Sequence, residues 1–243
     1  MHIVTLSFDD GFERSSIRTA EIFERHGLVA ELNVLAAGHL EESSDAWHTK
    51  WRKGDFALWN DLQARGHRVM PHGYRHADKT KLPLTEAQRS IERCLDAFTA
   101  ELEGFEPARA SFAFPYNRST PALEAWLGRR VRAFRTCGDA VMALPRPGQQ
   151  RIGCAGFGPD RCDDNLVATV DSFLDGPPAW LCYNLHGLDD EGWGPVGSDT
   201  LDDLLGRLVA RGVPVLPIVD ALEAAQPSSS ATRRSRKRRS ASE

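Results

Sequence analysis

Two neighbouring carboxylates and three histidines stand out in this sequence by their type and spacing. Asp9 and Asp10 directly follow an apolar run, His72 and His76 lie four residues apart, and His186 follows a later apolar run. Histidines with this spacing are neighbours on one helical turn and can share a metal ion. Carboxylates and imidazoles also exchange protons near neutral pH. The five residues therefore indicate a metal site or an acid-base site.

Each of these groups also has a plain structural interpretation. Asp9 and Asp10 precede Gly11, and such a sequence after a strand is often only a turn and a helix cap. Most histidine pairs with a spacing of four bind nothing, and His186 alone is typical of a hydrogen-bonded surface residue. The functional interpretation gains its strength from the coincidence of all five at the ends of predicted strands.

Short apolar runs alternate with amphipathic stretches through the first 225 residues, which is typical of an α/β domain. In parallel α/β folds the carboxyl ends of the strands form the functional rim. One rim then gathers the two carboxylates and the three imidazoles. The predicted strands are Ile3–Phe8, Val29–Leu35, His67–Pro71, Ala110–Phe114, Val131–Thr136, Trp180–Leu185 and Val213–Val219.

The clearest helix is predicted over Glu86–Glu103, because apolar residues recur there at steps of three and four. Thr85 is expected to cap it, with Gln88 completing a capping box. Thr120 before Pro121 is a second helix start. Further helices are predicted over Arg14–Arg25, Asp55–Arg65, Asp164–Leu174 and Asp199–Arg211, three of them ending in Gly. Residues 38–54, with Trp47, His48 and Trp51, are predicted to be a long loop.

Length and charge divide the chain of 243 residues into an α/β domain at 1–225 and a tail at 226–243. The tail carries six Lys or Arg and one Glu, so we predict that it is disordered and that its contacts with nucleic acid, if it makes any, are weak. A plain solvated extension without a selected role is the explanation that we favour. The net charge of −4 leaves an acidic body, a poor surface for nucleic acid.

Other global features narrow the class of protein. No apolar stretch approaches the roughly 20 residues of a membrane span, and the amino terminus lacks a secretion signal, so we expect a cytoplasmic protein. Five cysteines without a C-x-x-C pair favour free thiols over disulfides or a zinc knuckle.

With these residues in place, the sequence resembles the polysaccharide deacetylases of the NodB-homology group, carbohydrate esterase family 4. Residues 7–11 (SFDDG) are similar to the first motif of the family, and residues 72–76 (HGYRH) to the second. Residues 114–117 (FPYN) resemble the third motif, centred on P-Y-G, and residues 185–186 (LH) the last. The resemblance covers nearly all of residues 1–222.

The resemblance implies a distorted, incomplete (β/α) barrel whose Asp10, His72 and His76 bind a divalent metal, usually zinc. It implies further that Asp9 is the general base that activates water and that His186 is the general acid that protonates the departing amine. The backbone N–H of Tyr116 is expected to help hold the oxyanion.

One departure from the family concerns an arginine. In family members with R-P-P-Y-G in the third motif, an arginine contacts the base aspartate, whereas Ala113 stands at that position here. Arg109 or Arg135 is a replacement, and we favour Arg135 because it ends a strand at the same rim as Asp9. Either arginine is equally well explained as a surface cation.

A second departure concerns the acyl pocket. The family commonly has an apolar residue two positions before its last histidine, where this chain has Asn184. Residues two apart on a strand face the same side, so Asn184 should share the pocket with His186. This leaves the acyl group open between acetyl, formyl and others. Trp193, in a glycine-rich loop, is expected either to stack on a sugar ring or to pin that loop.

The leading hypothesis is a metal-dependent hydrolase that removes an N-acyl group, in the first place acetyl, from an amino sugar or glycoconjugate. A second hypothesis is hydrolysis of a non-sugar amide or a formyl group on the same scaffold. A third is a catalytically weak, carbohydrate-binding barrel, against which the intact set of five rim residues speaks.

Overall fold

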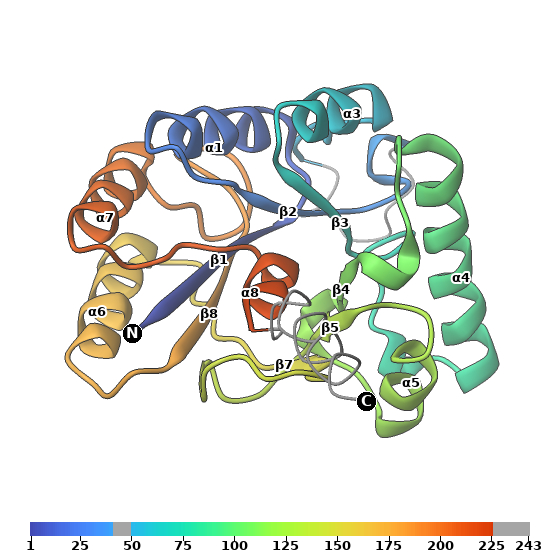
Figure 1. Cartoon of the computed structure of the whole chain (residues 1–243). Helices are drawn as coiled ribbons and strands as arrows, with labels where there is room; N and C mark the ends of the chain where they lie inside the picture. Colours follow the sequence, from blue (N-terminus) through green and yellow to red (C-terminus); the bar gives the residue numbers. More distant parts are fainter. Residues whose placement is uncertain (41–49, 226–243) are drawn as a thin grey trace, which may run out of the picture.

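Strands arranged in an incomplete ring, with helices outside them, form the frame of the molecule (Figure 1). The computed structural model describes residues 1–40 and 50–225. In these residues a five-stranded sheet has the order β3-β2-β1-β8-β6 and a three-stranded sheet the order β4-β5-β7. The strands are β1 Ile3–Asp10, β2 Glu31–Val34, β3 Arg68–Pro71, β4 Ser111–Ala113, β5 Ala133–Arg135, β6 Val141–Met142, β7 Arg151–Ile152 and β8 Trp180–Leu185.

The pairing makes the ring parallel. β1 pairs in parallel with β2 and β8, β2 with β3, β4 with β5, and β5 with β7, while the short β6 is antiparallel to β8. A single parallel bridge between Ala155 and Tyr183 joins the two sheets. Because parallel strands all point the same way, their carboxyl ends lie at one end of the ring.

The helices cover the outside of the strands (Figure 1). They are α1 Glu13–Arg25, α3 Phe56–Ala64, α4 Leu84–Glu101, α5 Pro121–Leu127, α6 Cys162–Leu174 and α7 Ser198–Ala210. Short 3-10 turns lie at η1 Gly38–Leu40, η2 Lys79–Lys81, η3 Pro107–Arg109 and η4 Pro115–Asn117. The predicted helices are confirmed to within a few residues.

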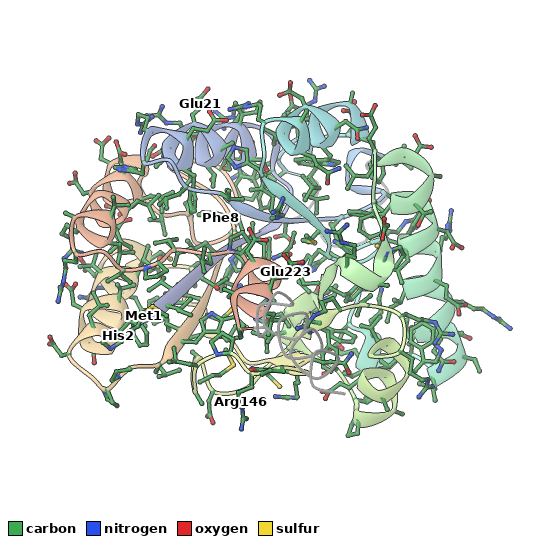
Figure 2. The ribbon with its side chains drawn as sticks, in the orientation of Figure 1. Met1, His2, Phe8, Glu21, Arg146 and Glu223 are labelled. Atoms are coloured by element: carbon green, nitrogen blue, oxygen red, sulfur yellow. The ribbon has the colours of Figure 1, made fainter. Side chains whose placement is uncertain are left out.

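Strand β1 is buried on both faces, and its successive side chains point alternately into two different environments. Val4 and Phe8 belong to the large core between strands and outer helices. Phe8, which is labelled in Figure 2, packs edge-on against Phe23 of α1 with 5.9 Å between ring centroids. On the other face, Thr5 and Asp9 belong to the interior of the ring. The alternation therefore delivers Asp9 to the inside at the carboxyl end of the strand.

Helix α8 (Ile218–Ala224) closes the amino end of the ring. Its Ile218 and Leu222 pack with Ile3 and Trp180, which begin β1 and β8. The predicted strand Val213–Val219 is wrong: only Val215 bridges to Val4, and the helix begins at Ile218. Pro214 and Pro217 have no N–H for a ladder, which explains the loss of the strand.

Two expectations about helix ends have opposite outcomes. The capping box at Thr85 is wrong, because α4 already begins at Leu84 after Pro83 and has no side-chain cap. The cap at Thr120 is confirmed, since its Oγ1 accepts a hydrogen bond from the backbone N–H of Leu123 at 3.3 Å, with Pro121 in the first turn. Sequence analysis does not predict β6, β7 or α8.

The remaining expectations concern the tail, the predicted loop, the cysteines and the membrane. The predicted tail at 226–243 lies outside the described residues, as do Trp47 and His48 of the predicted loop. The five cysteines are all free. In the part of the chain that the structure describes, no helix has the length and apolar character needed to cross a membrane.

Candidate active site

Asp10, His72 and His76 form a compact group at the carboxyl end of the ring, which we call the ligand cluster. Asp10 Oδ1 lies 3.6 Å from Nε2 of His72 and 3.6 Å from Nε2 of His76. One potential ligand atom from each of the three residues lies within 4.8 Å of the others. This is the spacing of atoms that can bind one ion in common.

The backbone around the ligand cluster adopts unusual conformations that aim these side chains. Asp10 has a φ of 76°, which turns its carboxylate away from that of Asp9 at the end of β1. His72 directly follows β3, and the segment from His72 to His76 is an irregular loop rather than the helical turn that the spacing suggested. Gly73 bends this loop with a φ of 111°, where a side chain would be strained.

His72 is prepared to act as a neutral ligand. Its Nδ1 lies 3.0 Å from the carbonyl oxygen of Ala113, so Nδ1 donates the proton and Nε2 faces Asp10 with a lone pair. Burial lowers the pKa of His72 to about 4, against the opposing pull of Asp9 and Asp10. The imidazole is therefore neutral at neutral pH, with Nε2 unprotonated, as metal binding requires.

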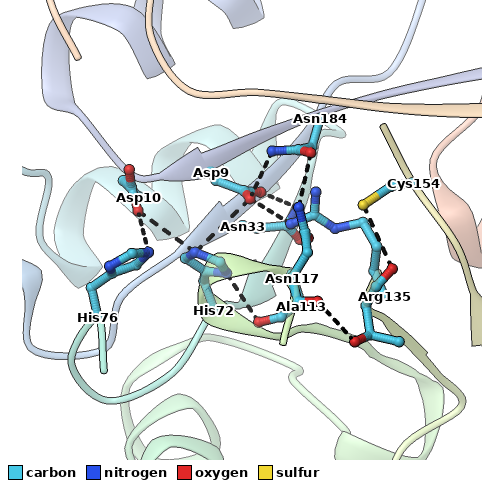
Figure 3. A network of polar contacts seen from close by, with 11 residues as sticks. Asp9, Asp10, Asn33, His72, His76, Ala113, Asn117, Arg135, Cys154 and Asn184 are labelled. Carbon is cyan, nitrogen blue, oxygen red and sulfur yellow. Dashed lines mark hydrogen bonds and ion pairs between the residues drawn. The ribbon is translucent and has the colours of Figure 1, made fainter. Parts of the chain in front are cut away.

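Asp9 is held by polar groups from three other strands (Figure 3). Its Oδ1 accepts a hydrogen bond from Asn33 Nδ2 at 3.1 Å, and its Oδ2 accepts one from Arg135 Nη2 at 2.5 Å and one from Asn184 Nδ2 at 3.4 Å. Burial raises the pKa of Asp9, but the charge of Arg135 and its hydrogen bond prevail and lower the pKa to about 2. Asp9 is thus a carboxylate at neutral pH.

Arg135 takes the place beside Asp9 that sequence analysis favoured over Arg109. The side chain of Arg135 is fully buried, and Asp9 raises its pKa, so it remains a cation. Ala113 is its direct partner across the β4–β5 ladder. The positive charge beside Asp9 therefore comes from β5, one strand away from the position on β4 where the family motif has its arginine. Both positions lie at the same level of the ring. Arg109 lies in η3, on a separate depression beside α8.

A cavity of about 470 Å³ opens beside Asp9 and the ligand cluster. His186 lies on its wall just after β8, together with Asn184. Trp193 also lines it, packing edge-on against His186 with 5.0 Å between ring centroids. The structure thus brings together the predicted base, acid and ligands. The residues that line the cavity are Asp9, Asp10, His72, His76, Tyr116, Asn117, Arg118, Gly156, Asn184, His186 and Trp193.

Tyr116 forms part of the mouth of the cavity. It lies in η4 with a φ of 58°, and its side chain is 46% exposed. Its ring lies over His76 with 4.3 Å between centroids. The tight turn at Tyr116 thus places its ring against the ligand cluster.

Sequence analysis gave no role to four residues that shape the site: Asn33, Asn117, Gly156 and Arg118. For Asn33 the available signal was its place on a predicted strand, two residues after Glu31. Residues two apart on a strand lie on the same face of the sheet, so these two polar side chains share a face. For Asn117 the signal was its position where the family motif has Gly. Gly156 and Arg118 carried no signal, because both lie in irregular segments.

The chain belongs to the polysaccharide deacetylase family. A model of that family, described as polysaccharide deacetylase, matches residues 1–125, which carry Asp9 and the whole ligand cluster. No curated protein sequence matches the chain.

Solved structures extend the likeness to the whole fold. Peptidoglycan deacetylase PdaC from Bacillus subtilis is 13% identical, with 100% of this chain and 98% of that chain covered and a TM-score of 0.60. A family 4 carbohydrate esterase from Streptomyces lividans, in complex with acetate, is 17% identical over 89% of this chain and 93% of that one, with a TM-score of 0.59. The Xyl-CE4 domain of a xylanase from the hindgut metagenome of Trinervitermes trinervoides is 14% identical over 92% and 90%, with a TM-score of 0.62. These likenesses establish an α/β fold of the esterase family 4 type.

Proposed function

We propose that this protein is a metal-dependent hydrolase that removes an N-acyl group from an amino sugar or glycoconjugate. The observation that carries the proposal is the meeting of the ligand cluster, Asp9 and His186 around one cavity. Membership in the polysaccharide deacetylase family supports the reaction class. The names of similar structures, among them a peptidoglycan deacetylase, support a glycan as the substrate.

The donor set fits a divalent ion, with zinc as our proposal. Two imidazoles and one carboxylate are three protein ligands, which leaves coordination positions for water and substrate, as catalytic zinc sites do. When bound, the ion supplies a Lewis acid that polarises the acyl carbonyl and makes water acidic enough to react near neutral pH. The neutral state of His72 matches this requirement.

The two proton carriers lie on the walls of the cavity. Asp9 accepts a proton from the attacking water as its oxygen bonds to the acyl carbon, and His186 delivers a proton to the amide nitrogen as the C–N bond breaks. The products are a carboxylic acid and a free amine on the sugar. Transfers of this kind contribute typically ~10²- to 10⁴-fold each to the rate. Arg135 and Asn33 keep the carboxylate of Asp9 in position for this exchange.

The mouth of the cavity provides contacts for the rest of the substrate. The backbone N–H of Tyr116 is our candidate donor to the oxyanion that forms at the acyl carbon. Trp193 contributes an aromatic surface at the mouth while it packs against His186, so sugar stacking and loop support are compatible roles.

The test combines metal analysis with hydrolysis. The wild-type protein, stripped of loosely bound ions and reloaded with zinc, is expected to hold about one ion per chain and to release acetate from N-acetylglucosamine oligomers. The Asp9→Asn variant should keep the ion and lose most of the hydrolysis. Equal hydrolysis by the two proteins would contradict the proposed role of Asp9.

A second candidate function is hydrolysis of a non-sugar amide or a formyl group. The observation that favours it is Asn184 in the cavity, where an apolar side chain is common in the family. A panel of N-acetylated sugars and simple amides separates the two candidates, because only the first predicts a preference for the sugars.

A further inference from the structure

Arg118 is the one arginine or lysine among the described residues that line the cavity. It directly follows η4, two residues after Tyr116, whose ring lies over that of His76 with 4.3 Å between centroids. The side chain of Arg118 is 59% exposed, so it is accessible from solvent at the mouth of the cavity. The reaction proposed above gives this cation no role.

Asp78 fixes one end of the Arg118 guanidinium. Its Oδ2 accepts a hydrogen bond from Arg118 Nη1 at 3.0 Å. Its Oδ1 accepts two from Thr80, one from the backbone N–H at 3.0 Å and one from Oγ1 at 2.6 Å. The side chain of Asp78 is only 7% exposed, and Asp78 does not line the cavity. Asp78 therefore orients Arg118 without presenting its own carboxylate to a ligand.

The backbone at the base of Arg118 is fixed as well. Arg118 N donates to the carbonyl oxygen of Pro115 at 3.2 Å. The carbonyl oxygen of Asn117 accepts hydrogen bonds from Cys137 N at 2.7 Å and Thr136 Oγ1 at 3.1 Å. A side chain that is held at both ends loses little further freedom when a ligand binds, so little affinity is lost to ordering.

The other edge of the guanidinium carries two parallel N–H groups, at Nε and Nη2. Neither has a hydrogen-bond or ion-pair partner in the part of the chain that the structure describes. Because Nη1 is bonded to a residue outside the cavity while Arg118 lines it, this edge lies on the cavity side. It is therefore open to a ligand.

Two other arginines of the chain show what such an edge binds. Arg65 donates from Nε and Nη2 to the two carboxylate oxygens of Glu24, at 2.8 and 3.0 Å. Arg68 donates from the same two atoms to the two oxygens of Asp220, at 2.9 and 3.3 Å. Parallel N–H groups match the two oxygens of a carboxylate or phosphate. In Arg118 the same edge faces a cavity instead of a protein carboxylate.

The proposed position of the acyl group decides which part of the substrate meets Arg118. With the scissile amide between the ligand cluster and His186, the sugar ring lies toward the mouth, where Tyr116 is 46% exposed. Arg118 is two residues from Tyr116, whose ring lies against the ligand cluster. A substituent on the ring carbon next to the acylated amine is therefore the part of the sugar best placed to reach the guanidinium.

We propose that Arg118 recognises an oxyanion carried by the sugar, so that the substrates are anionic amino sugars, with a carboxylate next to the acylated amine as the simplest case; this rests on the proposed function and deepens it. Nε and Nη2 of Arg118 each donate a hydrogen bond to one oxygen of the anion, while Asp78 holds Nη1. Because the site is open to solvent, salt screens the attraction and weakens the preference.

The test measures kcat/KM of the zinc-loaded full chain on N-acetylmuramic acid and on its methyl ester, which has nearly the same size but no charge. We expect the acid to be favoured by roughly fivefold or more at low salt, as for a bidentate but partly exposed ion pair, and by less at high salt. N-acetylglucosamine 6-phosphate, compared with N-acetylglucosamine, tests phosphate as the oxyanion. A preference for either anion supports the inference and identifies the oxyanion.

Variants assign the preference to Arg118. Arg118→Gln removes the charge and should bring the ratio of anionic to neutral sugar close to one. Arg118→Lys keeps the charge but lacks the parallel N–H groups, so its ratio should be intermediate. Arg207→Gln is the matched control, because Arg207 makes the same Nη1 ion pair, with Asp171 at 3.0 Å, on α7 outside the cavity. It should keep the ratio of the wild type.

Each result decides between the two proposals. If the wild type favours neither anion, or if Arg118→Gln leaves the ratio unchanged, the role of Arg118 is wrong while the proposed function stands. If the wild type hydrolyses none of these sugars and no N-acetylglucosamine oligomer, the proposed function fails, and calorimetry then decides the role of Arg118 separately. Zinc-loaded protein should bind N-acetylmuramic acid several-fold more tightly than its methyl ester, and Arg118→Gln should abolish that difference; equal binding overturns the inference.

Discussion

The ligand cluster and the surroundings of Asp9 lie side by side, yet the family model covers them to different degrees. Asp10, His72 and His76 all fall within the residues that the family model matches. Asp9 has two of its partners, Arg135 and Asn184, beyond that match. The contrast teaches that the three potential ligands come from two segments of the chain, whereas the carboxylate of Asp9 is held by donors from three further strands.

Strand register explains how the residues that hold Asp9 can vary in position. Ala113 and Arg135 are direct partners on β4 and β5, so a long cationic side chain from either position can reach the same point inside the ring. Asn33 and Asn184 both hold Asp9 through a side-chain amide N–H, so these two donors are of the same chemical kind. A buried carboxylate can therefore keep its charge while the residues that hold it change places.

The largest expected effect comes from the ligand cluster. His72→Ala removes a ligand, and we expect the metal content to fall from about one ion per chain to near zero. Hydrolysis should decrease by more than ~100-fold, the upper cost of losing merely an outer partner of a metal ligand. Mass spectrometry of the protein and an assay after reloading with zinc measure the two effects. A variant that retains one ion per chain would argue against the ligand cluster.

The surroundings of Asp9 should prove more replaceable. Arg135→Met leaves a buried carboxylate without its cation, and we expect the free energy of unfolding to fall by roughly 4 kcal/mol. The double variant Ala113→Arg, Arg135→Ala returns the cation to the neighbouring strand, and it should recover part of both stability and activity. Denaturant titration measures the recovery of stability, and kcat measures the recovery of activity. No recovery in the double variant would show that the position of the arginine is as strictly required as that of a ligand.

A third prediction concerns Glu31, which lies below Asp9 inside the ring. Burial raises the pKa of Glu31 to about 7, although its hydrogen bond from Ile218 N and the charge of Arg135 oppose the shift. The carboxyl keeps its proton longer in the folded state than in the unfolded state, where the pKa is near 4.5. The free energy of unfolding should therefore fall as the pH rises from about 4.5 to about 7, by roughly 3 kcal/mol at most.

The Glu31→Gln variant isolates this contribution. Its amide oxygen can still accept from Ile218 N, but it has no proton to lose. We expect the variant to match the wild type near pH 4.5 and to exceed it in stability at pH 8, by urea titration at both values. A constant difference across this range would mean that Glu31 does not titrate as its burial implies.

The smallest expected effect lies at the mouth of the cavity. Trp193→Phe keeps a ring against His186, whereas Trp193→Ala removes it. Because an aromatic pair is worth about 1 kcal/mol, we expect kcat/KM to fall by roughly fivefold for Trp193→Ala and by less for Trp193→Phe. Equal values for the three proteins would exclude both stacking on the sugar and support of His186.

Sequence patterns predicted the ring strands and the outer helices well, because apolar periodicity reports burial directly. Trp180–Leu185 was predicted to the residue, and the position of Asp9 and Asp10 at a strand end is confirmed. The patterns failed where short strands and α8 depend on tertiary contacts. Val213–Val219 reads as a strand because it is apolar, but its prolines and its packing against Ile3 and Trp180 produce a single bridge and a helix.

Within the site, residue type and strand ends brought the carboxylates and imidazoles to one rim and favoured Arg135 over Arg109. The division of the rim residues into ligands and base, and the expectation of an arginine beside Asp9, came from the resemblance to the family. The sequence could not reveal that Asn117 and Asn184 bond to each other, since they are 67 positions apart and meet only through the closure of the ring. Nor could it reveal the burial of Glu31, whose charge alone suggests a surface residue.

The central place of β1 has a consequence for folding. β1 is made first, but one of its two neighbours, β8, is made near the end of the domain, and α8 later still. A nascent chain therefore holds Asp9 and Asp10 on an unpaired strand edge for most of its synthesis, which favours aggregation. Such distant pairing also implies slow refolding compared with a helical protein of equal length. The candidate active site is complete only when the two ends of the domain have met.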